Sequence, residues 1–321
     1  MNKTRLLVSA LLVTVAVLWF LTPAKLESSG VEIVVPDDMD GWLLAGERET
    51  ARRFGLVPDT EKRLRWFDQR QRTGFVVIYL HGFSATRQET APLAETVASA
   101  LGANLFETRL RGHGRQREPL AGISAEDWLQ DAVEALTIAS RLGDRIVLIG
   151  TSTGATLAAA MLDHPLMQSV DTIVMISPNF APRDPNAAWL TRPAGPLLAR
   201  LMVGETRSWQ AHNEAQQRFW STTYTIDAAV EMMRLVNLAN RKLPARIPQR
   251  LLMLYSMDDA VISPQAALAV FEQTGSPQKA AIEIRDAGDP SRHVLAGDVL
   301  SAETTGEIAT AIVDFILRPV P

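Results

Sequence analysis

A serine between two glycines is the first feature of the chain that could do chemistry. The sequence GTSTG occupies residues 150–154, after the hydrophobic run 145–149 and before a segment rich in Ala and Leu. This context predicts a sharp strand-to-helix turn, in which side chains larger than those of Gly150 and Gly154 would clash. Such a turn places Ser152 at a helix N-terminus, where free N–H groups favour developing negative charge. The pattern therefore predicts that Ser152 is a nucleophile.

A serine hydroxyl needs a base to become a good nucleophile. The chain has five histidines, and only His293 follows the last predicted strand, at residues 281–284. A base in that place suits a chain order of nucleophile, acid and base. We therefore predict that His293 accepts the proton of Ser152. The other histidines lie in turns before the serine, after the helix that follows it, or in a long helical segment: His81, His113, His164 and His212.

The base in turn needs a carboxylate to orient it. Residues 251–255 form a predicted strand, and Asp258 and Asp259 follow it. We favour Asp259, because the apolar pair 261–262 behind it can pack back into the core. Asp258 stays the alternative, and Asp184, after the preceding strand, is a weaker one.

An oxyanion needs two backbone N–H donors. One is expected to be the N–H of Thr153, the residue after the nucleophile. The second is expected in the loop that follows the apolar run 75–80, with the N–H of Phe83 as the preferred donor. His81 and Gly82 are then expected to support this turn after the strand.

These residues require a scaffold in which strands and helices alternate. Such alternation predicts the α/β class, with a mostly parallel sheet and helices on both faces. The expected helices are 91–101 and 124–142, the latter with Ser124 as its N-cap. The expected strands are residues 75–80, 105–110, 145–149, 172–176, 251–255 and 281–284.

Two segments depart from this alternation. Residues 25–72 are polar and irregular, with one strand-like run at 31–35. Residues 178–250 show helical patterning and no convincing strand, and are interpreted as a helical insertion over the strand ends. The predicted organisation is a signal segment, an extension, a core in two pieces and a helical cap insertion: 1–24, 25–72, 73–180 with 246–321, and 181–245.

The N-terminus predicts export. Two basic residues precede the uncharged run 6–21, which is slightly short for a membrane span and ends with aromatic residues. We favour a signal anchor that leaves the catalytic domain on the periplasmic or extracellular side. The alternatives are a cleaved signal peptide, which gives a secreted protein, and a buried core helix.

Composition narrows the function further. The chain has 321 residues, a net charge of −4 and no cysteine, which argues against nucleic-acid binding, disulfides and thiol or cysteine–metal chemistry. No metal or other cofactor is expected, and the protein partners are unknown.

Five motifs in this order resemble the α/β-hydrolase superfamily, and within it the monoacylglycerol lipases, lysophospholipases and carboxylesterases. The resemblance covers residues 73–318 and rests on HGF (81–83), RLRGHGR (109–115), GTSTG (150–154), DDAVI (258–262) and RHV (292–294).

The resemblance implies a triad of Ser152, Asp259 and His293, with an oxyanion hole from the N–H groups of Phe83 and Thr153. It also implies that the insertion is a cap that forms the acyl pocket. We therefore expect a hydrolase of esters or lipids with apolar acyl chains. The alternatives are a proline-type serine aminopeptidase, an acyltransferase, or a non-catalytic membrane-anchored binding protein.

Overall fold

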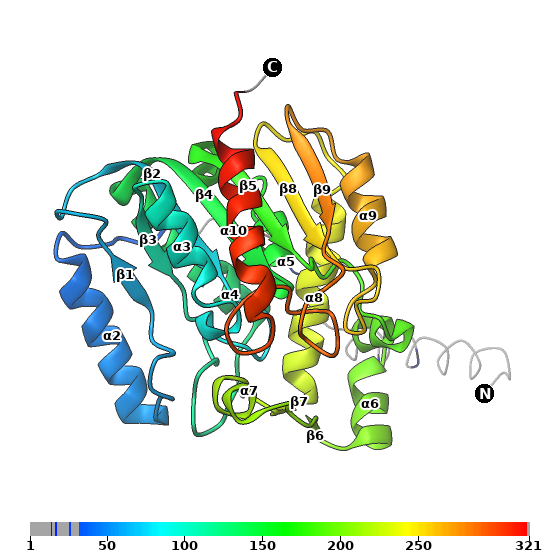
Figure 1. The fold of residues 1–321 in the computed structure, drawn as a ribbon. Helices are drawn as coiled ribbons and strands as arrows, with labels where there is room; N and C mark the ends of the chain where they lie inside the picture. Colours follow the sequence, from blue (N-terminus) through cyan, green and yellow to red (C-terminus); the bar gives the residue numbers. More distant parts are fainter. Residues whose placement is uncertain (1–13, 15–16, 18–25, 27–31, 320–321) are drawn as a thin grey trace, which may run out of the picture.

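The structure is a computed structural model, which describes Thr14, Val17, Leu26 and residues 32–319. Its centre is a seven-stranded sheet in the order β1-β3-β2-β4-β5-β8-β9 (Figure 1). Only β1 is antiparallel to its neighbour, and all other neighbours pair in parallel. The strands are β1 (Arg63–Arg65), β2 (Thr73–Leu80), β3 (Asn104–Glu107), β4 (Gly143–Thr151), β5 (Val170–Ile176), β8 (Arg250–Tyr255) and β9 (Lys279–Glu283).

Helices cover both faces of the sheet. Successive residues of a strand point to opposite faces, so the central strands contribute side chains to two hydrophobic cores. In β2, Val76 and Ile78 pack into one hydrophobic cluster, and Val77 and Tyr79 into the other. The first cluster includes residues of α2 (Met39–Phe54), α4 (Ala125–Leu142), α5 (Thr153–Ala160), α8 (Ile226–Lys242) and α9 (Pro264–Gln273). The second includes residues of α3 (Leu93–Ala100) and α10 (Ala302–Leu317).

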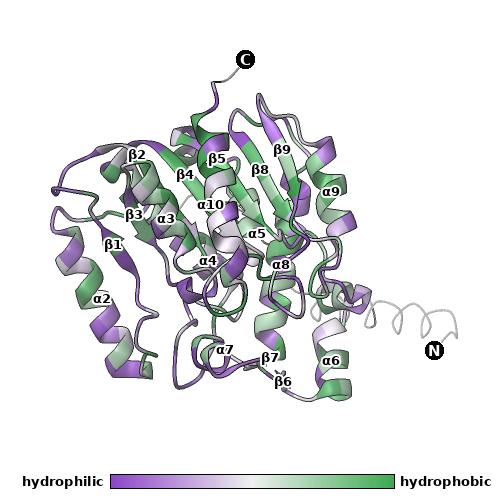
Figure 2. Cartoon of the chain, in the orientation of Figure 1, coloured by the Kyte–Doolittle hydropathy of each residue, from purple (hydrophilic) through white to green (hydrophobic). Residues whose placement is uncertain are grey.

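The predicted scaffold is confirmed in its main features. Each of the six expected strands overlaps an observed strand of the parallel part of the sheet, and both expected helices form. Ser124 caps α4 in a capping box, in which its hydroxyl accepts from the N–H of Asp127 and its N–H donates to the Asp127 carboxylate. Figure 2 shows the hydrophobic residues along the central strands that make both cores.

The N-terminal extension differs from the prediction. It contains α2 and β1, and the described part of the expected strand at 31–35 is not a strand. The helix was missed because its buried side is only partly apolar: Glu47 is buried there, in an ion pair with Arg109 of the core. Asp38 caps the start of this helix, and Gly55 follows its end.

The insertion was predicted without strands, but it contains a short hairpin. The chain runs through η3 (Pro185–Thr191), α6 (Gly195–Val203), β6 (Thr206–Ser208), α7 (Glu214–Phe219) and β7 (Thr223–Thr225) before α8. β6 and β7 pair over three residues each, too short to show a periodic pattern. In Figure 1 these elements lie below the sheet, while α8 packs against α5 and joins the helical layer.

No helix among the described residues is long and apolar enough to cross a membrane. The predicted anchor at residues 6–21 lies outside the described residues, apart from Thr14 and Val17.

Candidate active site

Ser152 lies in a strained turn between β4 and α5. Its backbone dihedrals are φ 52° and ψ −114°, a conformation that non-glycine residues rarely adopt. Its N–H donates to the carbonyl of Ile176 in β5, and its carbonyl accepts from the N–H of Thr156 in α5. The turn therefore holds the serine at the carboxyl edge of the sheet and at the first turn of a helix.

The two glycines of the motif permit this turn. A Cβ on Gly154 would lie 2.0 Å from the carbonyl oxygen of Leu80, and one on Gly150 would lie 2.7 Å from the backbone nitrogen of Ala155. Both distances are far inside van der Waals contact with backbone atoms. The spacing of glycines around Ser152 is thus a steric requirement of the packed structure.

His293 is paired with Asp259. His293 Nδ1 lies 2.8 Å from Asp259 Oδ2, and both side chains are buried. The other oxygen of Asp259 accepts hydrogen bonds from the N–H groups of Val261 and Ile262. The adjacent carboxylate, Asp258, is exposed to solvent, so the structure places Asp259 on the histidine.

The loop that carries His293 is held by a second carboxylate. Asp289 Oδ2 accepts from the N–H groups of His293 and Val294, at 3.0 and 2.8 Å. The carbonyl of His293 accepts from the hydroxyl of Ser177, the residue that follows β5. These bonds fix the imidazole relative to the strand ends.

The charge environment of His293 favours its protonated form. Burial alone would lower its pKa, but the carboxylates of Asp259, Asp289 and Glu89 outweigh burial, so the pKa lies above the usual value. An imidazole in this setting holds a proton more readily than one in water, as a general base must do during the reaction.

Two N–H groups beside Ser152 are open. Neither the N–H of Phe83 nor that of Thr153 donates a hydrogen bond to a described residue. Thr153 is the first residue of α5, where a helix has unpaired N–H groups. Phe83 follows Gly82, whose added Cβ would lie 3.3 Å from Ser152 Cβ. Both N–H groups are therefore available to donate hydrogen bonds.

Two buried histidines hold the loop of Phe83 in place. His81 Nε2 accepts from the N–H of Leu110, and His113 Nε2 accepts from the N–H of Ser84. Each ring is therefore neutral, with its proton on Nδ1. Burial lowers the pKa of His81 to about 4, and burial together with His81 holds the pKa of His113 well below its usual value. Both are structural groups of the site.

Ser152 and His293 line one cavity, of about 420 Å³, which is called the Ser152 cavity below. Ser152 Oγ makes no hydrogen bond to a described residue, and catalytic hydrogen bonds often tighten only when substrate binds. The hydrophobic lining comes from the core and the insertion: Phe83, Leu190, Trp209, Trp220, Tyr224, Met232 and Val261.

Several polar residues of this cavity were not predicted from sequence. Glu89, Asn179, Arg183 and His212 all line it. Asn179 Oδ1 is buried and has no hydrogen-bond partner. None of these residues belongs to a motif, and only the position of Glu89 shortly after HGF could have drawn attention to it.

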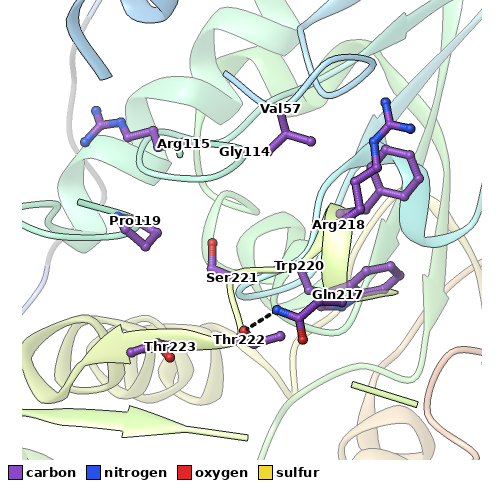
Figure 3. A pocket seen from close by; sticks show the side chains of 11 residues that line it. Val57, Gly114, Arg115, Pro119, Gln217, Arg218, Trp220, Ser221, Thr222 and Thr223 are labelled. Atoms are coloured by element: carbon purple, nitrogen blue, oxygen red, sulfur yellow. Dashed lines mark hydrogen bonds between the residues drawn. The ribbon is translucent and has the colours of Figure 1, made fainter. Parts of the chain in front are cut away.

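A smaller cavity of about 230 Å³ shares Trp220 with the Ser152 cavity. Figure 3 shows it between Arg115 and the insertion residues 217–223, with the amide of Gln217 bonded to the hydroxyl of Thr222. Trp220 is therefore a common wall of the two cavities.

Within the described part of the chain, no three His, Asp or Glu side chains are grouped so that they could hold a metal ion.

A family model described as serine aminopeptidase, S33 matches residues 71–288. The chain belongs to this family. The matched segment contains the turn of Ser152 and Asp259 and ends shortly before His293. Membership confirms the predicted superfamily and places the chain among hydrolases.

One relative by sequence is named a lipase. A thermostable monoacylglycerol lipase of Bacillus sp. (strain H-257) is 27% identical over 222 residues, which are 69% of this chain and 84% of the relative. Two solved structures share the fold, and their similarity confirms the predicted α/β-hydrolase architecture.

The first solved structure belongs to work on LipS and LipT, two metagenome-derived lipolytic enzymes. It has a TM-score of 0.67 and 21% identity, and the match covers 81% of this chain and 98% of that one. The second is a soluble variant of monoglyceride lipase from Saccharomyces cerevisiae, with a TM-score of 0.60, 14% identity and coverage of 80% and 91%.

Proposed function

We propose that this protein cleaves carboxylic esters with apolar acyl chains, through Ser152, His293 and Asp259. The observation that carries the proposal is the 2.8 Å contact between His293 Nδ1 and Asp259 Oδ2, in the cavity that the strained Ser152 also lines. A nucleophile, a base and an orienting acid on the ends of three different strands form the arrangement that acyl transfer requires.

In the first step Ser152 Oγ attacks the ester carbonyl. Its proton passes to His293 Nε2, while Asp259 accepts the Nδ1–H and stabilises the imidazolium. The new Oγ–C bond gives a tetrahedral oxyanion, to which the N–H groups of Phe83 and Thr153 donate. When the oxyanion collapses, the C–O bond to the alcohol breaks, and the alcohol leaves with the proton from His293.

In the second step a water molecule takes the place of Ser152 as the nucleophile. His293 takes a proton from water, and the hydroxide attacks the acyl–serine carbonyl. The same two N–H groups stabilise the second oxyanion. Its collapse releases the carboxylic acid and returns the proton to Ser152.

The aromatic and aliphatic lining of the Ser152 cavity supports an apolar acyl group. The relatives that are named monoacylglycerol lipase and lipolytic enzyme support the same substrate class.

A serine aminopeptidase is the second candidate, because the family description names that activity. It requires a carboxylate to hold the substrate ammonium. Four acidic residues of the insertion do not line the Ser152 cavity: Glu205, Asp227 and Glu231 are ion-paired, and Glu214 is exposed. Glu89, Asp184 and Asp289 are the carboxylates that line the Ser152 cavity without an ion pair to a described residue.

Hydrolysis of p-nitrophenyl esters of short and long acyl chains, in the wild type and in Ser152→Ala, tests the proposal. We expect turnover that favours longer chains, and a loss in kcat of about 10⁵-fold or more in the variant. Labelling of Ser152 by a fluorophosphonate checks the nucleophile independently of substrate.

Other outcomes contradict the ester proposal. Cleavage of prolyl p-nitroanilides without ester turnover would favour the aminopeptidase, and acyl transfer to added glycerol would favour an acyltransferase. A folded wild type that neither reacts with the fluorophosphonate nor turns over any substrate would favour a binding protein.

We also propose that residues 1–24 anchor the catalytic domain to a membrane on its exported side. The uncharged run at 6–21 behind two basic residues supports this. Protease treatment of intact cells or spheroplasts should digest the domain, and its protection until lysis would contradict the orientation.

A further inference from the structure

Glu89 is a buried carboxylate beside the proposed nucleophile. It ends η1 (Arg87–Glu89), the short helix after the Phe83 loop, and its side chain is 3% exposed. Its backbone is tightly packed, because a Cβ on Gly297 would lie 2.6 Å from the Glu89 carbonyl oxygen. The side chain nevertheless lines the Ser152 cavity.

One oxygen of Glu89 joins the two segments that carry the proposed oxyanion donors. Oε1 accepts from the N–H of Gly82 at 2.6 Å and from the hydroxyl of Tyr79 at 2.7 Å. The same hydroxyl lies 3.0 Å from Oγ1 of Thr151, the residue before Ser152. The chain of contacts therefore runs from the residue before Ser152 to the residue before Phe83.

The other oxygen, Oε2, lies close to Gly82, a residue that also approaches Ser152. A Cβ on Gly82 would lie 3.0 Å from Glu89 Oε2 and 3.3 Å from Ser152 Cβ. Oε2 makes no hydrogen bond to a described residue. A carboxylate so close to the serine acts on the charges that form there.

The ionisation of Glu89 is coupled to His293. Burial raises the pKa of Glu89 to about 7, although the bonds from Tyr79 and Gly82 and the charge of His293 oppose that rise. Arg87 on the same short helix donates to the carbonyl of Glu61. Tyr79 of β2 and His293 before α10 act on Glu89, and Asp259 and Asp289 act with it on His293. Glu214 and Arg218 are the charged residues of α7, which packs against η1.

We propose that Glu89 is a positioning residue for ester cleavage, which clamps the peptide before Phe83 through Oε1 and adds its carboxylate charge to the cavity that His293 also lines. The proposal rests on the proposed function. A hydrogen bond to Gly82 N–H sets the orientation of the peptide that precedes the open N–H of Phe83, and an oxyanion donor acts only when it is already aligned.

Two variants separate the clamp from the charge. Glu89→Asp keeps the charge but shortens the side chain, so that the oxygen no longer reaches Gly82 N–H. Glu89→Gln keeps an acceptor oxygen and removes the charge. Glu272→Asp and Glu272→Gln, at an exposed position of α9, are the matched controls.

We expect Glu89→Asp to lower kcat by about tenfold or more with KM within about twofold, and to slow fluorophosphonate labelling of Ser152 in parallel. We expect Glu89→Gln to keep kcat within about threefold and to move the acid limb of kcat/KM to lower pH, because His293 loses the negative charge of the ionised fraction of Glu89, whose own pKa is about 7. The controls should match the wild type.

Wild-type kcat in Glu89→Asp, or an equal loss in both variants with the acid limb unmoved, would overturn the proposal. If Glu89→Asp does not fold, Tyr79→Phe replaces it, since it removes the hydroxyl that orients Oε1. It should lower kcat several-fold, and an unchanged kcat would overturn the clamp. Activity in Ser152→Ala would instead refute the proposed function, so the two failures are distinguishable.

Discussion

The two sides of the Ser152 cavity are built differently. On the core side the proposed catalytic acid and base are held by hydrogen bonds: the carboxylate of Asp259 contacts two backbone N–H groups and one imidazole. On the insertion side, η3 and α6 expose large apolar side chains: Trp189 of η3, and Leu197, Leu198, Leu201, Met202 and Val203 of α6. Figure 2 colours part of α6 as hydrophobic.

The contacts that join the two sides near the serine include a backbone hydrogen bond and a ring contact. The N–H of Ser221 donates to the carbonyl of Ser84 at 2.7 Å, and the ring of Tyr224 packs edge-on against Phe83 at 4.9 Å between centroids. Changes on the core side should therefore alter the rate of the chemical step. Changes on the insertion side should alter the choice of acyl chain, because that side contributes surface to the cavity.

Substitutions of the adjacent residues Asp258 and Asp259, on the core side, should give the largest difference in kcat. Asp259→Asn should lower kcat by about 10³- to 10⁴-fold, because the amide no longer accepts the Nδ1–H of His293 and favours the wrong tautomer. Asp258→Asn, on an exposed side chain, should keep kcat within about twofold. Ester hydrolysis by both variants measures the difference, and similar losses would mean that Asp258 also serves the site.

The pH dependence of kcat/KM also tests the core side of the cavity, and its expected effect is smaller. His293 acts as a base only when neutral, and its pKa is raised, so kcat/KM should fall about tenfold per pH unit below a limb that lies above pH 6.5. The proton also contributes stability that is present below pH 6.5 and lost as pH rises through the folded-state pKa. An acid limb below pH 6.5 in the wild type would contradict the assigned charge environment.

Changes on the insertion side should have the smallest effect on rate. Trp220→Ala removes a wall of the Ser152 cavity and should change the ratio of long-chain to short-chain turnover several-fold, with kcat on acetate esters within about twofold. Met202→Ser is the control, since its side chain is 83% exposed and does not line the cavity. A large loss of kcat on the shortest ester in Trp220→Ala would show that the insertion also shapes the reaction centre.

Local patterns were sufficient for much of the scaffold and for the nucleophile. The strand before Ser152 is a continuous apolar run because β4 is buried on both faces, and GTSTG marks the turn because its glycines lie against backbone atoms. Such features depend on neighbouring residues and on backbone conformation, which a single sequence displays directly.

Features with a mixed local pattern were missed. Helix α2 buries a glutamate against an arginine of the core, so its sequence has no clear apolar stripe. The hairpin β6–β7 is too short for a periodic signal.

The sequence by itself determined the strands of the parallel part of the sheet, the turn of Ser152 and the histidine that follows the last strand, because each is encoded in a contiguous segment. Only the tertiary structure decided which of two adjacent aspartates meets His293, and that Glu89 joins Gly82 to Tyr79. These contacts connect residues that are distant in the chain or equal in type. Burial and the packing of the strand ends decide which of these residues meet, and no local sequence pattern records either of them.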